Sequence, residues 1–340
     1  MFGIRKFFDL KSYVLFLIVF AVTSNVFAAG SVKIRAGHFP NITHAPVLVG
    51  QATGRFEKAL KDEANIEWKL FNAGPEAVEA LAAGAIDILY VGPNPAINGF
   101  VRSKGVLLRA VAGVASGGSA FVVRNGSGIE KFEDIRGKRV ATPQLGNTQD
   151  VALRHLMSEK GLKSKTQGGN VEIFNLSGAD QLTAISKNQV DAVWAVEPWV
   201  SRFVSEANAK ILFDEKELWP DGKYATTILI IRKQFLDQNP GLVEKWVHEH
   251  VEIVRWMNQN QKKAKQIVND ELKREIGKSL PEKYLDQCFE RIRFTEDPME
   301  ASVLKSAERA FQIGFLGKAP IDLAQFYDLS FLKKSERPKK

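Results

Sequence analysis

The chain has 340 residues, of which 45% are apolar, 10% aromatic and 25% charged, and its formal net charge is +8. This length is typical of about two domains, and the composition excludes a disordered chain and a multispan membrane protein. The single cysteine, Cys288, excludes an internal disulfide and any zinc or iron–sulfur site built on cysteines. Basic residues are scattered and gather only in the tail at residues 333–340, so we expect no nucleic-acid partner.

Residues 1–28 have the features of a secretory signal peptide. Basic residues precede a continuous apolar run at residues 14–22, and Val26 and Ala28 place small side chains before a cleavage site. The run is shorter than the ~20 residues that span a bilayer as a helix, which favours cleavage near Ala28 over an uncleaved membrane anchor. Residues 1–28 hold three basic residues and one acidic residue, so the remaining chain carries a formal charge of +6. We expect a soluble monomer that is exported to the periplasm.

Strands and helices alternate after the leader. The pattern predicts strands at residues 32–36, 66–72 and 86–91, and helices at residues 43–53, 76–83 and 95–103. Such alternation is typical of βαβ units and of a mainly parallel sheet flanked by helices.

The pattern then recurs in the second half of the chain. In both halves a helix is followed by a turn residue that tolerates positive φ, an apolar strand, a loop and a helix that starts with proline. Asp87 corresponds to Asp191 in this repeat, and Tyr90 corresponds to Trp194. The simplest interpretation is an α/β protein with two lobes of related topology.

Three extended runs are candidates for the segments that cross between the lobes. They lie at residues 110–115, 120–124 and 224–231, and the first two are separated by a Ser-Gly-Gly-Ser sequence. The region after residue 233 has helical periodicity and would complete the first lobe. The expected boundaries are residues 29–117 and 228–340 for the first lobe and 118–227 for the second.

Polar and glycine-rich segments follow several strands and lead into helices. They lie at residues 39–44, 92–95, 143–149 and 197–199. In open α/β sheets ligands bind beyond the carboxyl ends of the strands, and a helix start offers unpaired N–H groups to an anion. Each segment alone could be ordinary helix capping, but four of them in two matched halves favour a binding cleft.

Enzymatic motifs are absent from the sequence: it contains no nucleophile elbow, no zinc-binding H-E-x-x-H and no phosphate-binding loop. We therefore expect a protein that is not an enzyme and that needs neither a metal nor a cofactor. Glu197, flanked by Trp194 and Trp199, would suit a cation such as an ammonium group in the cleft. The alternative, in which the tryptophans are core residues and Glu197 pairs with a neighbouring base, stays open.

Several runs are similar to one known family. They are Phe-Pro-Asn-Ile-Thr-His-Ala-Pro at residues 39–46, Tyr-Val-Gly-Pro-Asn-Pro-Ala-Ile at 90–97, residues 140–154, Glu-Pro-Trp at 197–199, Leu-Trp-Pro at 218–220 and Phe-Thr-Glu-Asp-Pro at 294–298. These runs resemble the substrate-binding proteins of ABC importers for aliphatic sulfonates, taurine and nitrate. The resemblance implies a two-lobed type II periplasmic binding fold with two hinge crossovers, a ligand in the hinge cleft, and delivery to the transmembrane subunits of an ABC permease.

The resemblance also implies a set of ligand-binding residues. An oxyanion, such as an aliphatic sulfonate or taurine, would lie near the backbone of Gly92, Asn94, Gly117, Gly118 and Thr148, with the side chains of Asn41, His44, Gln149 and Thr226 beside it and with Glu197 and Trp199 facing the rest of the ligand. Val196 stands where proline is expected in many relatives, which leaves the far end of the ligand open.

Other ligands and one enzyme share the implied architecture. The same fold could serve as a receptor for nitrate, bicarbonate or a pyrimidine precursor of thiamine. A pyrimidine synthase would need a cluster of cysteines, which a chain with Cys288 alone lacks. A sulfonate stays ionised, so its affinity should vary little with pH unless His44 must be protonated, in which case affinity would fall as pH rises through ~6.5.

Overall fold

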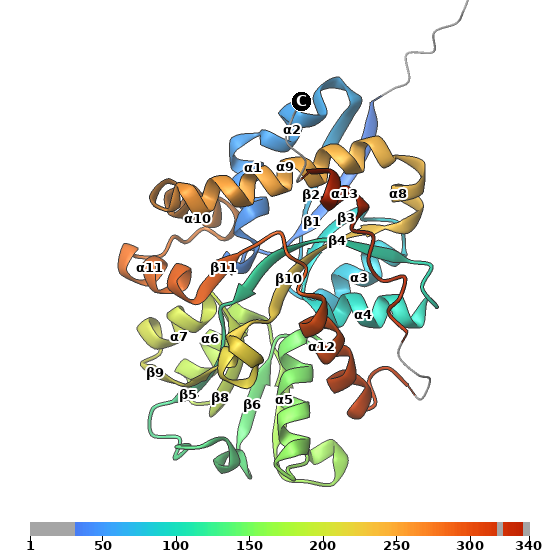
Figure 1. Ribbon diagram of the computed structural model, residues 1–340. Coiled ribbons are helices and arrows are strands. Elements are labelled where there is room, and N and C mark those ends of the chain that lie inside the picture. Colours follow the sequence, from blue (N-terminus) through green and yellow to red (C-terminus); the bar gives the residue numbers. More distant parts are fainter. Residues whose placement is uncertain (1–30, 318–321, 336–340) are drawn as a thin grey trace, which may run out of the picture. The chain divides into compact units, whose positions relative to one another are not determined.

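The computed structural model describes residues 31–317 and 322–335 (Figure 1). The expected signal peptide at residues 1–28 lies outside the described residues. Within the described ranges, no helix has the length and apolarity needed to cross a membrane.

The first sheet has six strands in the order β11-β4-β10-β3-β1-β2. Its strands are β1 (Val32–His38), β2 (Ala64–Leu70), β3 (Ile88–Val91), β4 (Leu108–Gly117), β10 (Ala225–Arg232) and β11 (Ile292–Phe294). β1 runs parallel to β2 and β3, whereas β10 runs antiparallel to β3 and β4, and β11 antiparallel to β4.

The second sheet has five strands in the order β7-β6-β8-β5-β9. Its strands are β5 (Ser119–Arg124), β6 (Arg139–Thr142), β7 (Glu172–Asn175), β8 (Ala192–Val196) and β9 (Ala209–Asp214). β6 runs parallel to β7 and β8, and β5 runs antiparallel to β8 and β9.

The α/β fold with two sheets is confirmed, but each sheet is mixed rather than mainly parallel. The antiparallel pairs involve β4, β5 and β10, which carry the chain from the first sheet to the second and back. The alternation of strands and helices predicts only the βαβ parts, because β5 follows β4 directly and no α-helix lies between β9 and β10. Gly117 and Gly118 join β4 to β5 with φ values of 82° and 79°, a conformation that favours glycine.

Helices cover both faces of both sheets (Figure 1). Those packed with the first sheet are α1 (Ala45–Thr53), α2 (Arg55–Leu60), α3 (Gly74–Ala82), α4 (Pro93–Arg102), α8 (Lys233–Gln238), α9 (Pro240–Gln259), α10 (Gln261–Ile276), α11 (Glu282–Arg291), α12 (Glu300–Gln312) and α13 (Ser330–Ser335). Those packed with the second are α5 (Thr148–Glu159), α6 (Gly178–Ser186) and α7 (Trp199–Glu206). Short 3-10 turns complete the chain: η1 (Ile42–His44), η2 (Lys61–Glu63), η3 (Phe132–Ile135), η4 (Lys165–Gln167), η5 (Glu215–Leu218) and η6 (Pro220–Gly222).

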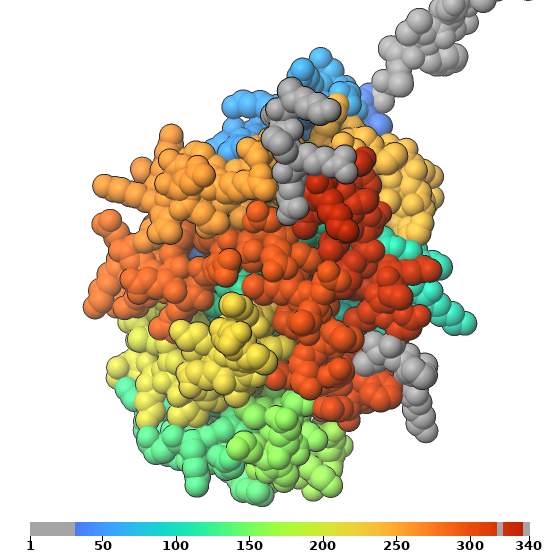
Figure 2. Space-filling view, in the orientation of Figure 1, coloured from blue at the N-terminus to red at the C-terminus, as the bar shows by residue number. Residues whose placement is uncertain are grey.

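The strand β3 shows why these sheets need helices on both sides. Ile88 and Tyr90 pack into the core cluster under α1, α9 and α10, whereas Leu89 and Val91 pack into the cluster under α3, α4 and α12. A strand that is buried on both faces reads as a continuous apolar run, as this one does. The C-terminal helices also reach the second sheet's helices, since α11 contacts α7 and α12 contacts α5 (Figure 2).

The internal repeat reappears as a pair of matching ion clusters. Asp87 precedes β3 and Asp191 precedes β8, and each accepts hydrogen bonds from an arginine 52 residues earlier. Each carboxylate is held by two guanidinium groups: those of Arg35 and Arg232 for Asp87, and those of Arg139 and Arg124 for Asp191. Each cluster ties three neighbouring strands together at the point where β3 or β8 begins.

We predict that Asp191→Asn lowers the free energy of unfolding by about 1–3 kcal/mol at pH 7, because two arginines lose their partner. Burial alone raises the pKa of Asp191, but hydrogen bonds from Arg139 and Arg124 outweigh it and lower the pKa to about 2. The stabilisation is therefore present above the unfolded pKa and is lost as pH falls toward the folded one. Urea unfolding should show the deficit of the variant shrinking by about half between pH 7 and pH 3.

The matched control is Asp62→Asn, at an exposed position in η2, which should change stability by less than about 0.5 kcal/mol at either pH. A deficit of Asp191→Asn that stays constant between pH 7 and pH 3 would contradict the role given to the carboxylate.

Candidate functional site

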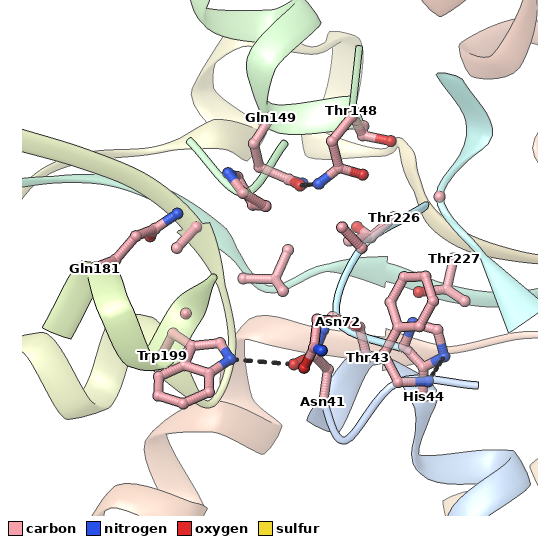
Figure 3. Close-up of a pocket in the computed structure, with 18 residues that line it drawn as sticks. Asn41, Thr43, His44, Asn72, Thr148, Gln149, Gln181, Trp199, Thr226 and Thr227 are labelled. Carbon is pink, nitrogen blue, oxygen red and sulfur yellow. Dashed lines mark hydrogen bonds between the residues drawn. The ribbon is translucent and has the colours of Figure 1, made fainter. Parts of the chain in front are cut away.

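A cavity of about 50 Å³ lies where loops of the two sheets meet (Figure 3). The first sheet contributes residues that follow β1, β2 and β3, together with Thr226 and Thr227 of β10. The second sheet contributes residues that follow β6, β7 and β8. The cavity therefore lies beyond the carboxyl ends of the parallel strands of both sheets, where open α/β sheets bind their ligands.

Several helices start at this cavity. Gly92 is the N-cap of α4, Asn147 is the N-cap of α5, and Gly178 opens α6, and all three line the cavity. The first-turn N–H groups of Thr148 and Gln149 have no acceptor within their own helix, as in any α-helix. Helix starts of this kind carry a partial positive charge and favour an anion.

The cavity has no fixed charge of its own. Among the described residues that line it, none is Asp, Glu, Lys or Arg. Its one ionisable side chain is His44, whose pKa is held well below the usual 6.5, first by complete burial and then by the nearby His38. The N–H of Phe39 donates to Nδ1 of His44 at 3.4 Å, so the ring proton lies on Nε2. At neutral pH His44 is thus an uncharged hydrogen-bond donor.

Three side-chain oxygens at the cavity are buried, and no described residue hydrogen-bonds to them. They are Oγ1 of Thr148, Oγ1 of Thr227 and Oε1 of Gln181. A buried polar atom without a partner costs about 1–3 kcal/mol, so a molecule that pairs with these atoms would recover that cost on binding. The two hydroxyls can donate to an anion, and the amide oxygen can only accept.

The two sets of loops touch each other around the cavity. Nε1 of Trp199 donates to Oδ1 of Asn41 at 3.2 Å, which links α7 of the second sheet to the loop after β1 (Figure 3). Gly92 also lies close to α5, because a Cβ at this position would lie 2.4 Å from Oγ1 of Thr148. A side chain at position 92 would therefore displace the Thr148 hydroxyl from its present place.

Most residues expected at the site line the cavity. Those that line it are Asn41, His44, Gly92, Thr148, Gln149, Trp199 and Thr226. Thr226 does so with its hydroxyl already donating to the carbonyl of Gly117 at 2.7 Å. Asn94, Gly117, Gly118 and Glu197 do not line it.

The expectation that Glu197 faces the ligand is wrong. Its side chain is completely buried and accepts hydrogen bonds from Ser201 N and Oγ at 2.9 and 3.0 Å and from Sγ of Cys288 at 3.2 Å. Arg291 lies 3.5 Å away as its ion-pair partner, and burial raises the pKa of the carboxyl group. The alternative, a core glutamate paired with a base, is the observed one. Trp194 is likewise a core residue whose Nε1 donates to Glu215 at 2.9 Å.

Asn94 and the glycine pair have structural roles in place of the expected ones. The side chain of Asn94 donates to the carbonyl of Ser306 at 3.2 Å and so anchors α12 to α4. Gly117 and Gly118 form the crossover between β4 and β5 and pack against β11, where a Cβ on Gly117 would lie 2.4 Å from the Arg291 carbonyl. The backbone of this glycine pair therefore joins the two sheets and does not line the cavity.

Five polar residues that were not named as ligand contacts also line the cavity: Thr43, Asn72, Asn147, Gln181 and Thr227. Thr43 and Asn147 lie in the segments 39–44 and 143–149, which the sequence predicted to form the cleft. Thr227 is a polar residue at the start of the apolar run of β10, and Asn147 precedes α5 in the position of a cap. Its Nδ2 instead donates to Oε1 of Gln149 at 3.1 Å, which leaves Nε2 of Gln149 able to donate elsewhere.

In the described ranges, no three His, Cys, Asp or Glu side chains lie together as the ligands of a metal ion would. Cys288 is buried among Glu197 and Ser201 and does not reach the cavity.

Comparisons with known proteins agree with this architecture. A taurine-binding periplasmic protein of Escherichia coli (strain K12) is 27% identical over 207 residues, which span 61% of this chain and 61% of that protein. The alkanesulfonate-binding protein SsuA from Xanthomonas axonopodis pv. citri, solved bound to MOPS, superposes with a TM-score of 0.72 at 20% identity, covering 88% of this chain and 99% of that one. The nitrate-binding protein NrtA from Synechocystis PCC 6803 gives 0.70 at 14% identity, covering 90% and 88%.

These likenesses establish the two-lobed fold of periplasmic binding proteins and confirm the resemblance read from the sequence. The aligned region spans about three fifths of the Escherichia coli relative. The sequence model of the NMT1-like family matches residues 28–269, well over half of the chain, and the chain therefore belongs to the NMT1-like family.

Proposed function

We propose that the protein is the solute-binding component of an ABC importer and that it captures a small organic oxyanion, an aliphatic sulfonate, in the cavity between the two sheets. The observation that carries this proposal is the cavity itself: its described lining contains no Asp, Glu, Lys or Arg, several helices start at it, and it holds two buried hydroxyls to which no described residue hydrogen-bonds. The named relatives are binding proteins for taurine, alkanesulfonates and nitrate, which supports a binding role over an enzymatic one.

A sulfonate matches the donors of the cavity. It carries one permanent charge spread over three oxygens, and each oxygen can accept from more than one donor. The N–H groups of Thr148 and Gln149, the hydroxyls of Thr148 and Thr227, and Nε2–H of His44 together supply such donors from both sheets. Hydrogen bonds to a charged acceptor contribute about 1.5–3 kcal/mol each, so no arginine or lysine is required.

Binding would hold the protein closed. Because the donors come from two sheets, a ligand that contacts both stabilises the closed arrangement of the two lobes, which we place at residues 29–117 with 228–340 and at 118–227. The closed protein would then present its cargo to the transmembrane subunits of a permease. A leader at residues 1–28 would export it to the periplasm, where a soluble monomer fits this role.

Nitrate is a second candidate ligand, since the cavity of about 50 Å³ admits only a small solute. It ranks below a sulfonate because it has no tail that could carry a hydrogen-bond donor to Oε1 of Gln181. A cysteine-dependent pyrimidine synthase is disfavoured, because Cys288 is buried against Glu197 and away from the cavity.

Ligand binding can be measured by thermal shift and isothermal titration with ethanesulfonate, 2-hydroxyethanesulfonate, taurine and nitrate. At about 100 times Kd a ligand adds about 2.7 kcal/mol to the free energy of unfolding, which raises Tm by several degrees. We expect at least one sulfonate to produce this shift and methylammonium to produce none. Absence of a shift with all the sulfonates would contradict the proposed ligand.

A matched pair of variants ties the binding to this cavity. In Gly92→Ala the new methyl group would lie 2.4 Å from Oγ1 of Thr148, so we expect affinity to fall about tenfold or more. In Gly241→Ala, near the start of α9, the Cβ would meet no described atom within 4 Å, and affinity should not change. Equal affinity in both variants would place the ligand elsewhere.

Affinity for a sulfonate should be constant within about twofold between pH 6 and pH 8. The ligand stays ionised, and burial keeps the pKa of His44 below this window, so neither partner changes charge. If affinity changes at more acidic pH, it should rise as pH falls, because protonated His44 would add a positive charge. A tenfold loss of affinity as pH rises from 5.5 to 7.5 would contradict a neutral His44.

A further inference from the structure

Gln181 is a buried side chain whose unpaired oxygen has no role in binding an anion, because an amide oxygen only accepts hydrogen bonds. It lies in α6, is 0% exposed and lines the cavity. Its Nε2 donates to the carbonyl of Leu176 at 2.9 Å. Because a carbonyl can only accept, the amide nitrogen must face Leu176, and the orientation of the amide is fixed. Oε1 consequently points away from Leu176, and no described residue donates to it.

The surroundings of Gln181 supply neither a donor for this oxygen nor a counter-charge for a cation. Trp199, on the same side of the cavity in Figure 3, has already given its N–H to Asn41. Its ring packs against the backbone of Gly178, and the Arg202 guanidinium lies 4.7 Å from the ring centroid. Arg202 is itself paired with Glu206 at 2.8 Å, and the carboxylate of Asp180 accepts from Ser177 at 2.6 Å. Glu197 is turned into the core, so no carboxylate belongs to the described lining of the cavity.

On the basis of the proposed function, we infer that the cavity selects sulfonates whose tail ends in an uncharged hydrogen-bond donor, a hydroxyl group above all, and that Gln181 is the residue that determines this specificity. The sulfonate would lie against the helix starts of α4 and α5, and the tail would place its hydroxyl against Oε1 of Gln181. An alkyl tail would leave Oε1 buried and unpaired. An ammonium tail would be desolvated without a carboxylate to pair with it, since none belongs to the described lining of the cavity.

Three probes of nearly equal size test this selectivity: 2-hydroxyethanesulfonate, 1-propanesulfonate and taurine, which end in hydroxyl, methyl and ammonium. Isothermal titration of the purified protein at pH 7 should give the lowest Kd for the hydroxyl compound, by about tenfold or more over each of the others. This comparison uses the unaltered protein and does not depend on any variant folding.

Two substitutions then assign the effect to Gln181. Gln181→Met removes the acceptor at similar volume, so the preference for hydroxyl over methyl should disappear. Gln181→Glu supplies a carboxylate, so taurine should gain at least tenfold relative to 2-hydroxyethanesulfonate. The matched control is Gln51→Glu, because Oε1 of Gln51 is also buried without a described partner but Gln51 lies in α1 and does not line the cavity. It should leave the order of the three ligands unchanged.

The outcomes distinguish a failure of the specificity assigned to Gln181 from a failure of the proposed function. Equal affinities for the hydroxyl and methyl compounds, or tightest binding of taurine by the unaltered protein, would overturn the inference and leave the proposed function standing. Binding of none of the three would overturn the proposed function and this inference with it.

Discussion

The proposed function places one constraint on the architecture: an anion must be held in a cavity whose described lining contains no Asp, Glu, Lys or Arg. Burying an ion is costly unless hydrogen bonds replace its hydration, and here helix starts and neutral hydroxyls would replace it. Such donors work only if they converge from several directions, which explains why loops of both sheets meet at the cavity. The close approach of Gly92 to Thr148 and the bond from Trp199 to Asn41 hold that convergence in place.

The repeated construction of the two sheets produces this convergence. Asp87 and Asp191 fix equivalent strands through the same pattern of arginine hydrogen bonds, on the side opposite to the helix starts. Charges that lie near the cavity are paired rather than free: Asp150, in the first turn of α5, is fully buried and accepts from Gly146 N and from Arg154, each at 2.9 Å. Glu197 follows the same rule, since Ser201 and Arg291 hold it within the core instead of in the cavity.

Sequence reasoning anticipated the features that local patterns encode. The repeat around Asp87 and Asp191 and the polar segments before helices were readable because short-range spacing determines them. The direction in which the Glu197 side chain points was not readable, because it is decided by Cys288 and Arg291, which lie about ninety residues later in the chain. The place of Gln181 at the cavity could not be predicted for a similar reason. It follows a strand of only four residues with weak periodicity, and tertiary packing alone brings it to the cavity.

The central claim is that neutral donors at helix starts hold the anion, and a crystal structure with 2-hydroxyethanesulfonate tests it most directly. The account predicts sulfonate oxygens within hydrogen-bond distance of the Thr148 and Gln149 main-chain nitrogens and of the Thr227 hydroxyl, with no lysine or arginine nitrogen in contact. A sulfonate bound through lysine or arginine side chains, or bound outside the cavity between the sheets, would contradict it.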